Sequence, residues 1–185
     1  MPVTKLDPNT ALIVVDLQNG LVGAVATFDA VVARSRALAD AFRARDLPVV
    51  LVTVDGVAPG RTEQPARLPD TLPGDFAERV AGLGQQPGDI LVTKRSWGAF
   101  ATTGLEQRLR VLGVTQVVVT GVSTGTGVEA TARQAYEAGF NVTLAIDAMA
   151  DPRASAHDHS IANVFPRLGE TGTSDDILAL LEGHA

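Results

Sequence analysis

The stretch that decides the fold is residues 11–19, Ala-Leu-Ile-Val-Val-Asp-Leu-Gln-Asn. Its first five residues are apolar without interruption, which is typical of a β-strand covered on both faces, as in a parallel sheet. Asp16 comes directly after this run, where burial would raise the pKa of its carboxyl group. We expect this acid to take part in chemistry; the alternative is a carboxylate that caps a nearby turn.

Further apolar, β-branched runs have the length of strands and are separated by helical patterns. The predicted strands are residues 11–15, 49–54, 90–93, 117–120 and 142–146, and the predicted helices are residues 27–45, 103–113 and 127–139, with two more beginning near residues 151 and 173. Strand followed by helix, repeated along the chain, predicts an α/β fold with right-handed crossovers.

Several helix starts carry capping signals. Thr27 is expected to cap the first helix, and Thr103 with Glu106 has the spacing of a capping box. Asp151 followed by Pro152 is the pattern of an N-cap and a first helical residue. The last helix is expected to open at Thr173 and Asp176.

We expect one domain over residues 1–185, which is enough chain to bury a large core. Residues 55–88 break the alternation of strand and helix with five prolines and many glycines, apart from a helical turn expected within residues 76–83. Long loops in compact domains are usually functional and often form lids.

Composition excludes several classes of function. The formal net charge is −6, with 15 Lys and Arg residues spread along the chain, so nucleic acid is not an expected partner. No apolar run approaches the roughly 20 residues that cross a bilayer. The start of the chain lacks the pattern of a signal peptide, which predicts a cytoplasmic protein without membrane contact. The absence of cysteine excludes disulfides, thiolate metal sites and a Cys nucleophile.

Ligands of open parallel sheets bind outside the carboxyl ends of the strands. Lys94 follows the third predicted strand and could pair with Asp16 or with an anionic substrate, the alternative being a surface lysine. Residues 121–127, Gly-Val-Ser-Thr-Gly-Thr-Gly, follow the fourth strand and offer backbone N–H groups to an oxyanion, although a tight strand–helix turn would look the same. They match neither a P-loop nor a dinucleotide fingerprint, so no cofactor is expected.

Aromatic and histidine residues give weaker signals. Trp97 and Phe100 could wall a pocket, although packing is the commoner role of aromatic side chains. His157 and His159 lie two positions apart on a predicted helix, about 200° around its axis, so they cannot share a metal ion. We expect His157 to be a packed residue and predict no metal site.

Three motifs together resemble the isochorismatase-like (cysteine hydrolase) superfamily. They are Leu-Ile-Val-Val-Asp-Leu-Gln-Asn at 12–19, Thr-Lys-Arg-Ser-Trp-Gly-Ala-Phe at 93–100 and Val-Thr-Gly-Val-Ser-Thr-Gly-Thr-Gly-Val-Glu-Ala-Thr-Ala-Arg at 119–133. The resemblance covers nearly the whole chain. It implies a three-layer Rossmann-like fold whose mostly parallel, six-stranded sheet has helices on both faces, usually in homo-oligomers. It also implies a non-proline cis peptide near Val122 and Ser123.

The same resemblance places the family's catalytic Asp, Lys and Cys at Asp16, Lys94 and Gly127. With Gly at the third position, attack on an amide by a thiolate is not open to this chain. Isochorismatases of the superfamily also have Gly there, and their vinyl ether hydrolysis requires no nucleophilic side chain. We therefore predict hydrolysis of an isochorismate-like enolpyruvyl ether, in which Asp16 donates a proton and Lys94 binds a carboxylate of an anionic small-molecule substrate.

The expected substrate-binding residues are Gln18, Trp97, Phe100, Ser123, Thr124 and Gly127. Gln18 is also expected to orient Asp16. By resemblance, a carboxylate-binding arginine lies in the long loop, where Arg61 and Arg67 are both candidates. Family isochorismatases read Trp-Arg-Tyr-Ser after the Lys, whereas residues 95–98 here are Arg-Ser-Trp-Gly.

Two alternatives from other classes stay open. The first is a hydrolase with Ser123, Thr124 or Thr126 as nucleophile, although no His base is evident near that loop in the sequence. The second is a catalytically silent ligand-binding member that kept the fold and lost the thiol.

Overall fold

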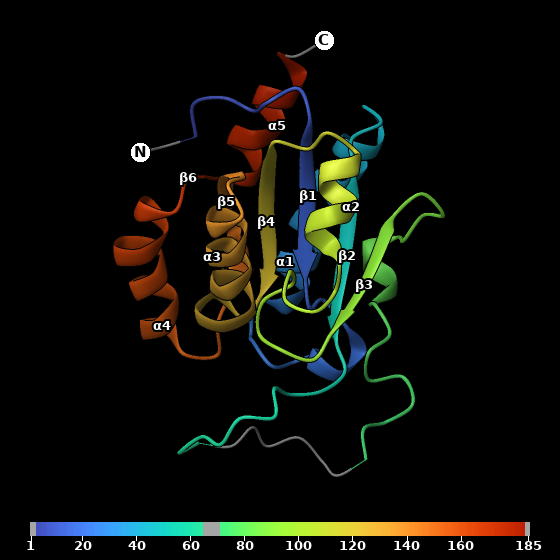
Figure 1. The fold of residues 1–185 in the computed structure, drawn as a ribbon, viewed down its shortest axis with the longest axis vertical. Helices are drawn as coiled ribbons and strands as arrows, with labels where there is room; N and C mark the ends of the chain where they lie inside the picture. Colours follow the sequence, from blue (N-terminus) through green and yellow to red (C-terminus); the bar gives the residue numbers. More distant parts are fainter. Residues whose placement is uncertain (1–2, 65–70, 184–185) are drawn as a thin grey trace.

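The computed structural model describes residues 3–64 and 71–183. Its centre is a six-stranded sheet in the order β3-β2-β1-β4-β5-β6, in which every neighbouring pair is parallel (Figure 1). The strands are β1 (Thr10–Val15), β2 (Val49–Val54), β3 (Ile90–Lys94), β4 (Gln116–Val122), β5 (Asn141–Ala150) and β6 (Glu170–Gly172). The chain order reverses between β1 and β4, which is the switch point where ligands of such sheets bind.

Helices cover both faces of the sheet, so the predicted three-layer α/β fold is confirmed. They are α1 (Phe28–Arg43), α2 (Leu105–Val111), α3 (Glu129–Glu137), α4 (Ala154–His159) and α5 (Ser174–Glu182). Side chains of β1 alternate between two cores: Leu12 and Val14 pack with α1 and α5, whereas Ile13 and Val15 pack with α2 and α3. In Figure 1, α2 and α3 lie in front of the sheet and α1 lies behind it.

Short helical turns complete the chain. They are η1 (Asn19–Leu21), η2 (Ala81–Leu83), η3 (Thr124–Val128), η4 (Ser160–Val164) and η5 (Phe165–Arg167), of which η3 and η4 are π-helical. Because η3 occupies the start of the predicted third helix, regular α3 begins only at Glu129. No helix in the described ranges is long and apolar enough to cross a membrane.

Two predicted helix caps are wrong. Helix α2 begins after Gly104, whose φ of 70° suits glycine, while the Thr103 hydroxyl donates to Ala99 O at 2.6 Å. Helix α4 begins after Arg153, because the Asp151 carboxylate accepts from Arg153 N at 2.9 Å and caps the preceding turn instead.

One further cap prediction is confirmed in full and another only in its position. Thr173 and Asp176 form the capping box of α5, and Thr27 occupies the N-cap of α1 without a side-chain capping bond. Within the long loop, the expected helical turn is the short η2. The described parts of this loop reach away from the carboxyl end of β2 (Figure 1). Phe76 and Leu83 are buried and attach its second half to the body of the protein.

Candidate active site

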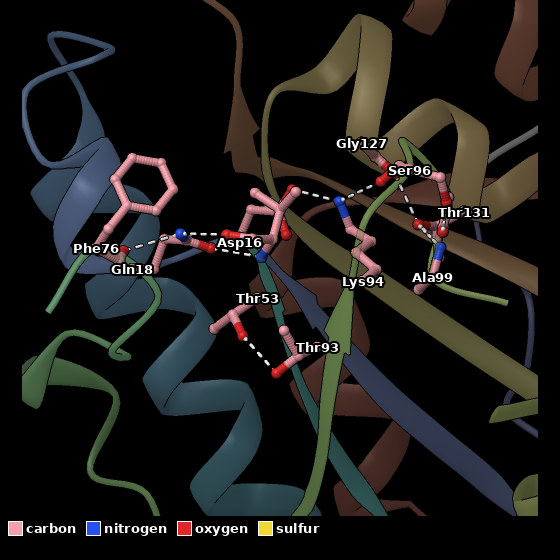
Figure 2. A network of polar contacts seen from close by, with 12 residues as sticks. Asp16, Gln18, Thr53, Phe76, Thr93, Lys94, Ser96, Ala99, Gly127 and Thr131 are labelled. Carbon is pink, nitrogen blue, oxygen red and sulfur yellow. Dashed lines mark hydrogen bonds and ion pairs between the residues drawn. The ribbon is translucent and has the colours of Figure 1, made fainter. Parts of the chain in front are cut away.

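Asp16 and Lys94 meet at the carboxyl edge of the sheet, as the sequence predicts (Figure 2). Asp16 directly follows β1, and Lys94 is the last residue of β3, with β2 between them. Lys94 Nζ lies 2.7 Å from Asp16 Oδ2. The side chains are only 2% and 7% exposed, so the ion pair is almost fully removed from water.

The backbone of Asp16 is held in a conformation that is unfavourable for a residue with a side chain. Its φ is 55°, in the left-handed region, which costs a non-glycine residue roughly 1–2 kcal/mol. Asp16 N donates to Val52 O at 2.9 Å, and Asp16 O accepts from Gln18 N at 3.1 Å. Such strain at a strand end indicates that the surrounding structure fixes the direction of this carboxyl group.

Burial dominates the electrostatics of Asp16. It raises the pKa of the carboxyl group to about 6, against the opposing effect of the Lys94 ammonium. Oδ2 accepts from Lys94, whereas the buried Oδ1 has no hydrogen-bond partner among residues 3–64 and 71–183. A proton on Asp16 is therefore best placed on Oδ1, the oxygen that the protein leaves free.

The turn after β4 lies against this pair. Its peptide bond between Val122 and Ser123 is cis, as the resemblance implies. A Cβ added to Gly127 would lie 3.1 Å from Asp16 Oδ2 and 3.2 Å from Val122 O. Gly127 therefore borders the carboxyl group directly, and even one carbon there would crowd it.

Gln18 has a different set of contacts from the expected one. Its buried Nε2 donates to Val54 O and Phe76 O, both at 2.9 Å, and its Oε1 accepts from Val54 N at 2.7 Å. The amide thus fastens the long loop to the end of β2 (Figure 2). The described contacts between Gln18 and Asp16 are through the backbone, so orienting the carboxyl group does not fall to the Gln18 side chain.

The aromatic candidates differ in exposure. The Trp97 residue is 67% exposed, whereas Phe100 is half-buried and packs on Phe140 with ring centroids 5.8 Å apart. Both belong to the segment that follows Lys94, the last residue of β3. Their contact with a ligand stays a prediction.

The turn residues Ser123 and Thr124 also differ. Ser123 is half-buried, and Thr124 is fully buried with its Oγ1 2.9 Å from His157 Nδ1. No His base near this loop is evident from the sequence, but α4 brings His157 to it in the structure. The pairing spans 33 positions along the chain, which no local pattern reveals.

Arg79 is a candidate that the sequence analysis missed. It forms an antiparallel bridge with Gln18 beside the carboxyl end of β1. Its buried Nε has no hydrogen-bond partner in the described part of the chain, and burial lowers its pKa. Of the two arginines proposed from the sequence, Arg61 is exposed and Arg67 lies outside the described residues.

The described ranges contain no group of three or more His, Asp or Glu residues placed to hold a metal ion. His157 bonds to Thr124, and His159 faces Asn163 at 3.4 Å. The carboxyl edge thus presents a buried acid, a buried ammonium group and a glycine beside them, with the Thr124–His157 pair in the neighbouring turn.

The fold and the buried Asp–Lys pair define an α/β protein of hydrolase type, and comparisons with known proteins agree. The isochorismatase domain model matches residues 10–176, and the chain belongs to the isochorismatase family. It is 41% identical over 180 residues to the isochorismatase family protein YecD of Escherichia coli O157:H7, covering 93% of this chain and 96% of YecD.

Other relatives extend this picture. A solved isochorismatase family protein from Burkholderia thailandensis superposes with a TM-score of 0.91 at 39% identity, covering 96% of this chain and 98% of that one. The ureidoacrylate amidohydrolase RutB of Stutzerimonas stutzeri is 30% identical over 176 residues, covering 78% of this chain and 71% of RutB. The family thus includes amide hydrolases as well as isochorismatases.

Proposed function

We propose that this protein hydrolyses the vinyl ether bond of an isochorismate-like enolpyruvyl ether, with Asp16 as the acid, and releases pyruvate. The observation that carries the proposal is the asymmetry of the Asp16 carboxyl group. One oxygen is bound by Lys94, and the other is buried, free of a described partner and part of a group whose pKa is about 6. The raised pKa brings protonation of Asp16 closer to neutral pH than for an ordinary carboxyl group.

The proton moves from Asp16 Oδ1 to the methylene carbon of the enolpyruvyl group. The carbon–carbon double bond supplies the electron pair, and an oxocarbenium ion remains at the ether carbon. Water adds to that carbon and loses a proton, which restores the acid. The resulting hemiketal breaks the bond between this carbon and the former ether oxygen. The proton of the hemiketal hydroxyl passes to the departing oxygen, which gives pyruvate and an alcohol. General acid catalysis of this kind contributes typically 10²–10⁴-fold.

Lys94 fits two tasks in this reaction. Two of its three N–H donors have described acceptors, Asp16 Oδ2 and Ser96 O at 3.1 Å, which leaves one for a substrate oxygen. Its positive charge also stabilises the Asp16 anion that forms on proton transfer. A negatively charged substrate would counteract the effect of Lys94 on the free acid, because substrate anions near Asp16 favour the protonated form.

The neighbouring residues support a small anionic ligand. Gly127 approaches Asp16 so closely that a side chain there would crowd the carboxyl group. A chain without cysteine also has no thiolate for the amide cleavage that Cys-dependent members perform. Arg79, with its buried and unpaired Nε, is a candidate for a substrate carboxylate.

The proposal is tested by offering the purified protein isochorismate and simpler enolpyruvyl ethers in parallel with a panel of small amides. Coupled assays follow pyruvate in the first set and ammonia in the second. Pyruvate release supports the proposal. Ammonia release without pyruvate contradicts it, and tight ligand binding without either product identifies a silent binding member.

A second candidate function rests on the contact between Thr124 Oγ1 and His157 Nδ1. A hydroxyl beside an imidazole is the arrangement of an activated nucleophile. In this candidate Thr124 attacks an amide or ester carbonyl, although the buried position of its hydroxyl argues against the reaction. Loss of ammonia release in Thr124→Val, with His157→Gln behaving alike, would support this candidate over acid catalysis.

A further inference from the structure

Two side chains of α3 hold the segment that follows Lys94. Thr131 and Gln134 lie three residues apart and so share one face of the helix. Thr131 Oγ1 accepts from Ala99 N at 3.1 Å, and Gln134 Oε1 accepts from Phe100 N at 3.0 Å and Ala101 N at 3.3 Å. Three consecutive backbone N–H groups are therefore bound by two side-chain oxygens of a neighbouring helix.

The same segment contacts the ammonium group of the site. Ser96 O accepts from Lys94 Nζ at 3.1 Å. Gly98 packs so closely on Gln134 that a Cβ there would lie 2.2 Å from Gln134 Oε1. The path from Gln134 through residues 96–101 to the Lys94 ammonium is thus short and continuous.

Thr131 also reaches the other side of the site. Its hydroxyl donates to Gly127 O at 2.7 Å while accepting from Ala99 N, and the residue is fully buried (Figure 2). One hydroxyl therefore joins the segment after Lys94 to the turn that borders the Asp16 carboxyl group.

We propose that Thr131 and Gln134 are positioning residues that hold residues 96–101 against the Asp16–Lys94 pair and keep water from it. The expected effect on kcat/KM rests on the proposed function. The expected effect on the position of residues 96–101 rests on geometry alone. Neither residue touches the reacting atoms; both act through the backbone of the segment. Loss of these contacts frees the segment, so Lys94 loses a fixed acceptor and water reaches Asp16.

The expected electrostatic effect has a definite sign. Burial is the largest cause that raises the pKa of Asp16, and Lys94 is the charged group that opposes it. Water entering beside the carboxyl group reduces the penalty of burial. The pKa of Asp16 then falls from about 6 toward the ordinary value of 3.8.

The experiment compares Gln134→Leu, which removes the acceptor, with Gln134→Glu, which keeps one. Thr131→Val and Thr131→Ser form a second matched pair, and Gln107→Leu is a control on an exposed position of α2. Gln134 is half-buried, so its variants are the ones expected to fold. Thermal unfolding is followed for every variant.

Two readouts do not depend on turnover. Trp97 is the single tryptophan of the chain and lies within the held segment, so acrylamide quenching of its fluorescence reports this segment alone. Carboxyl ¹³C titration, assigned with Asp16→Asn, gives the pKa of Asp16. Initial rates of pyruvate release supply kcat and KM.

We expect Gln134→Leu to increase the quenching constant of Trp97 and to lower the pKa of Asp16, while Gln134→Glu and Gln107→Leu keep wild-type values. We also expect kcat/KM of Gln134→Leu to fall about tenfold, since small misplacements of reacting groups reduce rates strongly. Unchanged quenching and an unchanged Asp16 pKa in folded Gln134→Leu would overturn the inference. A wild-type protein that releases no pyruvate would instead contradict the proposed function, while both spectroscopic readouts still decide the role of these residues.

Discussion

Two carboxylates of this protein are buried beside cations, and they differ in how completely they are satisfied. Asp89 is bound through both oxygens, by Arg43 Nε at 3.0 Å and Arg43 Nη2 at 2.7 Å, and Oδ2 also accepts from Gln86 N at 2.8 Å. In Asp16 one oxygen accepts a hydrogen bond from Lys94, and the other has no hydrogen-bond partner in the described structure.

This difference is the one expected between an acid with a structural role and the acid of the proposed reaction. A buried carboxylate with both oxygens bound gains charge-assisted hydrogen bonds and has no oxygen left for a ligand. One with an unsatisfied oxygen retains an unfavourable desolvation energy, which a bound proton or substrate relieves. Asp89 therefore ties α1 to the start of β3, whereas Asp16 keeps one oxygen free, as the proposed proton transfer requires.

The largest expected effect comes from removing the acid alone. Asp16→Asn keeps the shape of the side chain but cannot donate an acidic proton, so turnover should fall by about 10³-fold or more. Ligand affinity should change little, because Lys94 and Arg79 remain. Pyruvate release and isothermal titration calorimetry measure the two quantities, and substantial turnover by the variant would remove Asp16 from the mechanism.

A second prediction concerns the pH dependence of stability. The pKa of Asp16 is about 6 in the folded protein and near 3.8 in the unfolded chain, so the folded state binds the proton more tightly between these values. The contribution of Asp16 to the free energy of unfolding therefore decreases as pH rises from about 4 to about 6, by on the order of 3 kcal/mol. Above pH 6 it stays constant.

Urea unfolding of wild type and Asp16→Asn at several pH values measures this contribution as a difference. The variant lacks the titrating group, so the loss of stability over this interval should be smaller in it. Parallel curves for the two proteins between pH 4 and 7 would contradict a raised pKa for Asp16.

The sequence predicted the polar pair but not its full surroundings. Asp16 and Lys94 could be found because each ends an apolar strand, and parallel strands bring their carboxyl ends to one edge. The role of Gln18 could not, since its amide binds backbone atoms of residues 54 and 76, far along the chain. No local sequence pattern distinguishes Arg79. What distinguishes it is that its buried Nε has no hydrogen-bond partner in the described structure.

The fold shows the same division. Five strands were predicted from apolar runs, whereas β6 has only three residues, Glu-Thr-Gly, and no run to detect. Helix α2 begins after Gly104 because the Thr103 hydroxyl bonds Ala99 O, four residues back, instead of capping the helix. Helix α4 begins after Arg153, and the Asp151 carboxylate accepts from the distant Gly125 N instead of capping the helix. Apolar runs are a local property of the sequence, so they predicted the longer strands. Polar contacts between distant segments could not be predicted in this way.

A third prediction concerns Asp89, whose substitution is expected to lower stability rather than turnover. Asp89→Asn removes the charge from a fully bound pair and should lower the free energy of unfolding by about 2 kcal/mol, because Arg43 keeps weaker acceptors. The kcat of the folded protein should stay at the wild-type value, since Asp89 lies at the start of β3, one strand length from Lys94. Urea unfolding and initial rates test both statements; a large loss of kcat without a loss of stability would undo the contrast between the two acids.

The smallest expected effect is a gain. In Gly127→Cys the new Cβ would lie 3.1 Å from Asp16 Oδ2 and 3.2 Å from both Val122 O and Val15 Cγ1, so these neighbours must shift by a few tenths of an ångström. If they do, the thiol lies beside an acid that can accept its proton, which is the arrangement of a nucleophilic cysteine. We expect slow ammonia release from small amides, together with reduced pyruvate release because the cysteine fills the space beside the acid.

Gly127→Ala is the matched control, since it crowds Asp16 in the same way without supplying sulfur. Equal ammonia release by the two variants would show that the thiol performs no chemistry at this position.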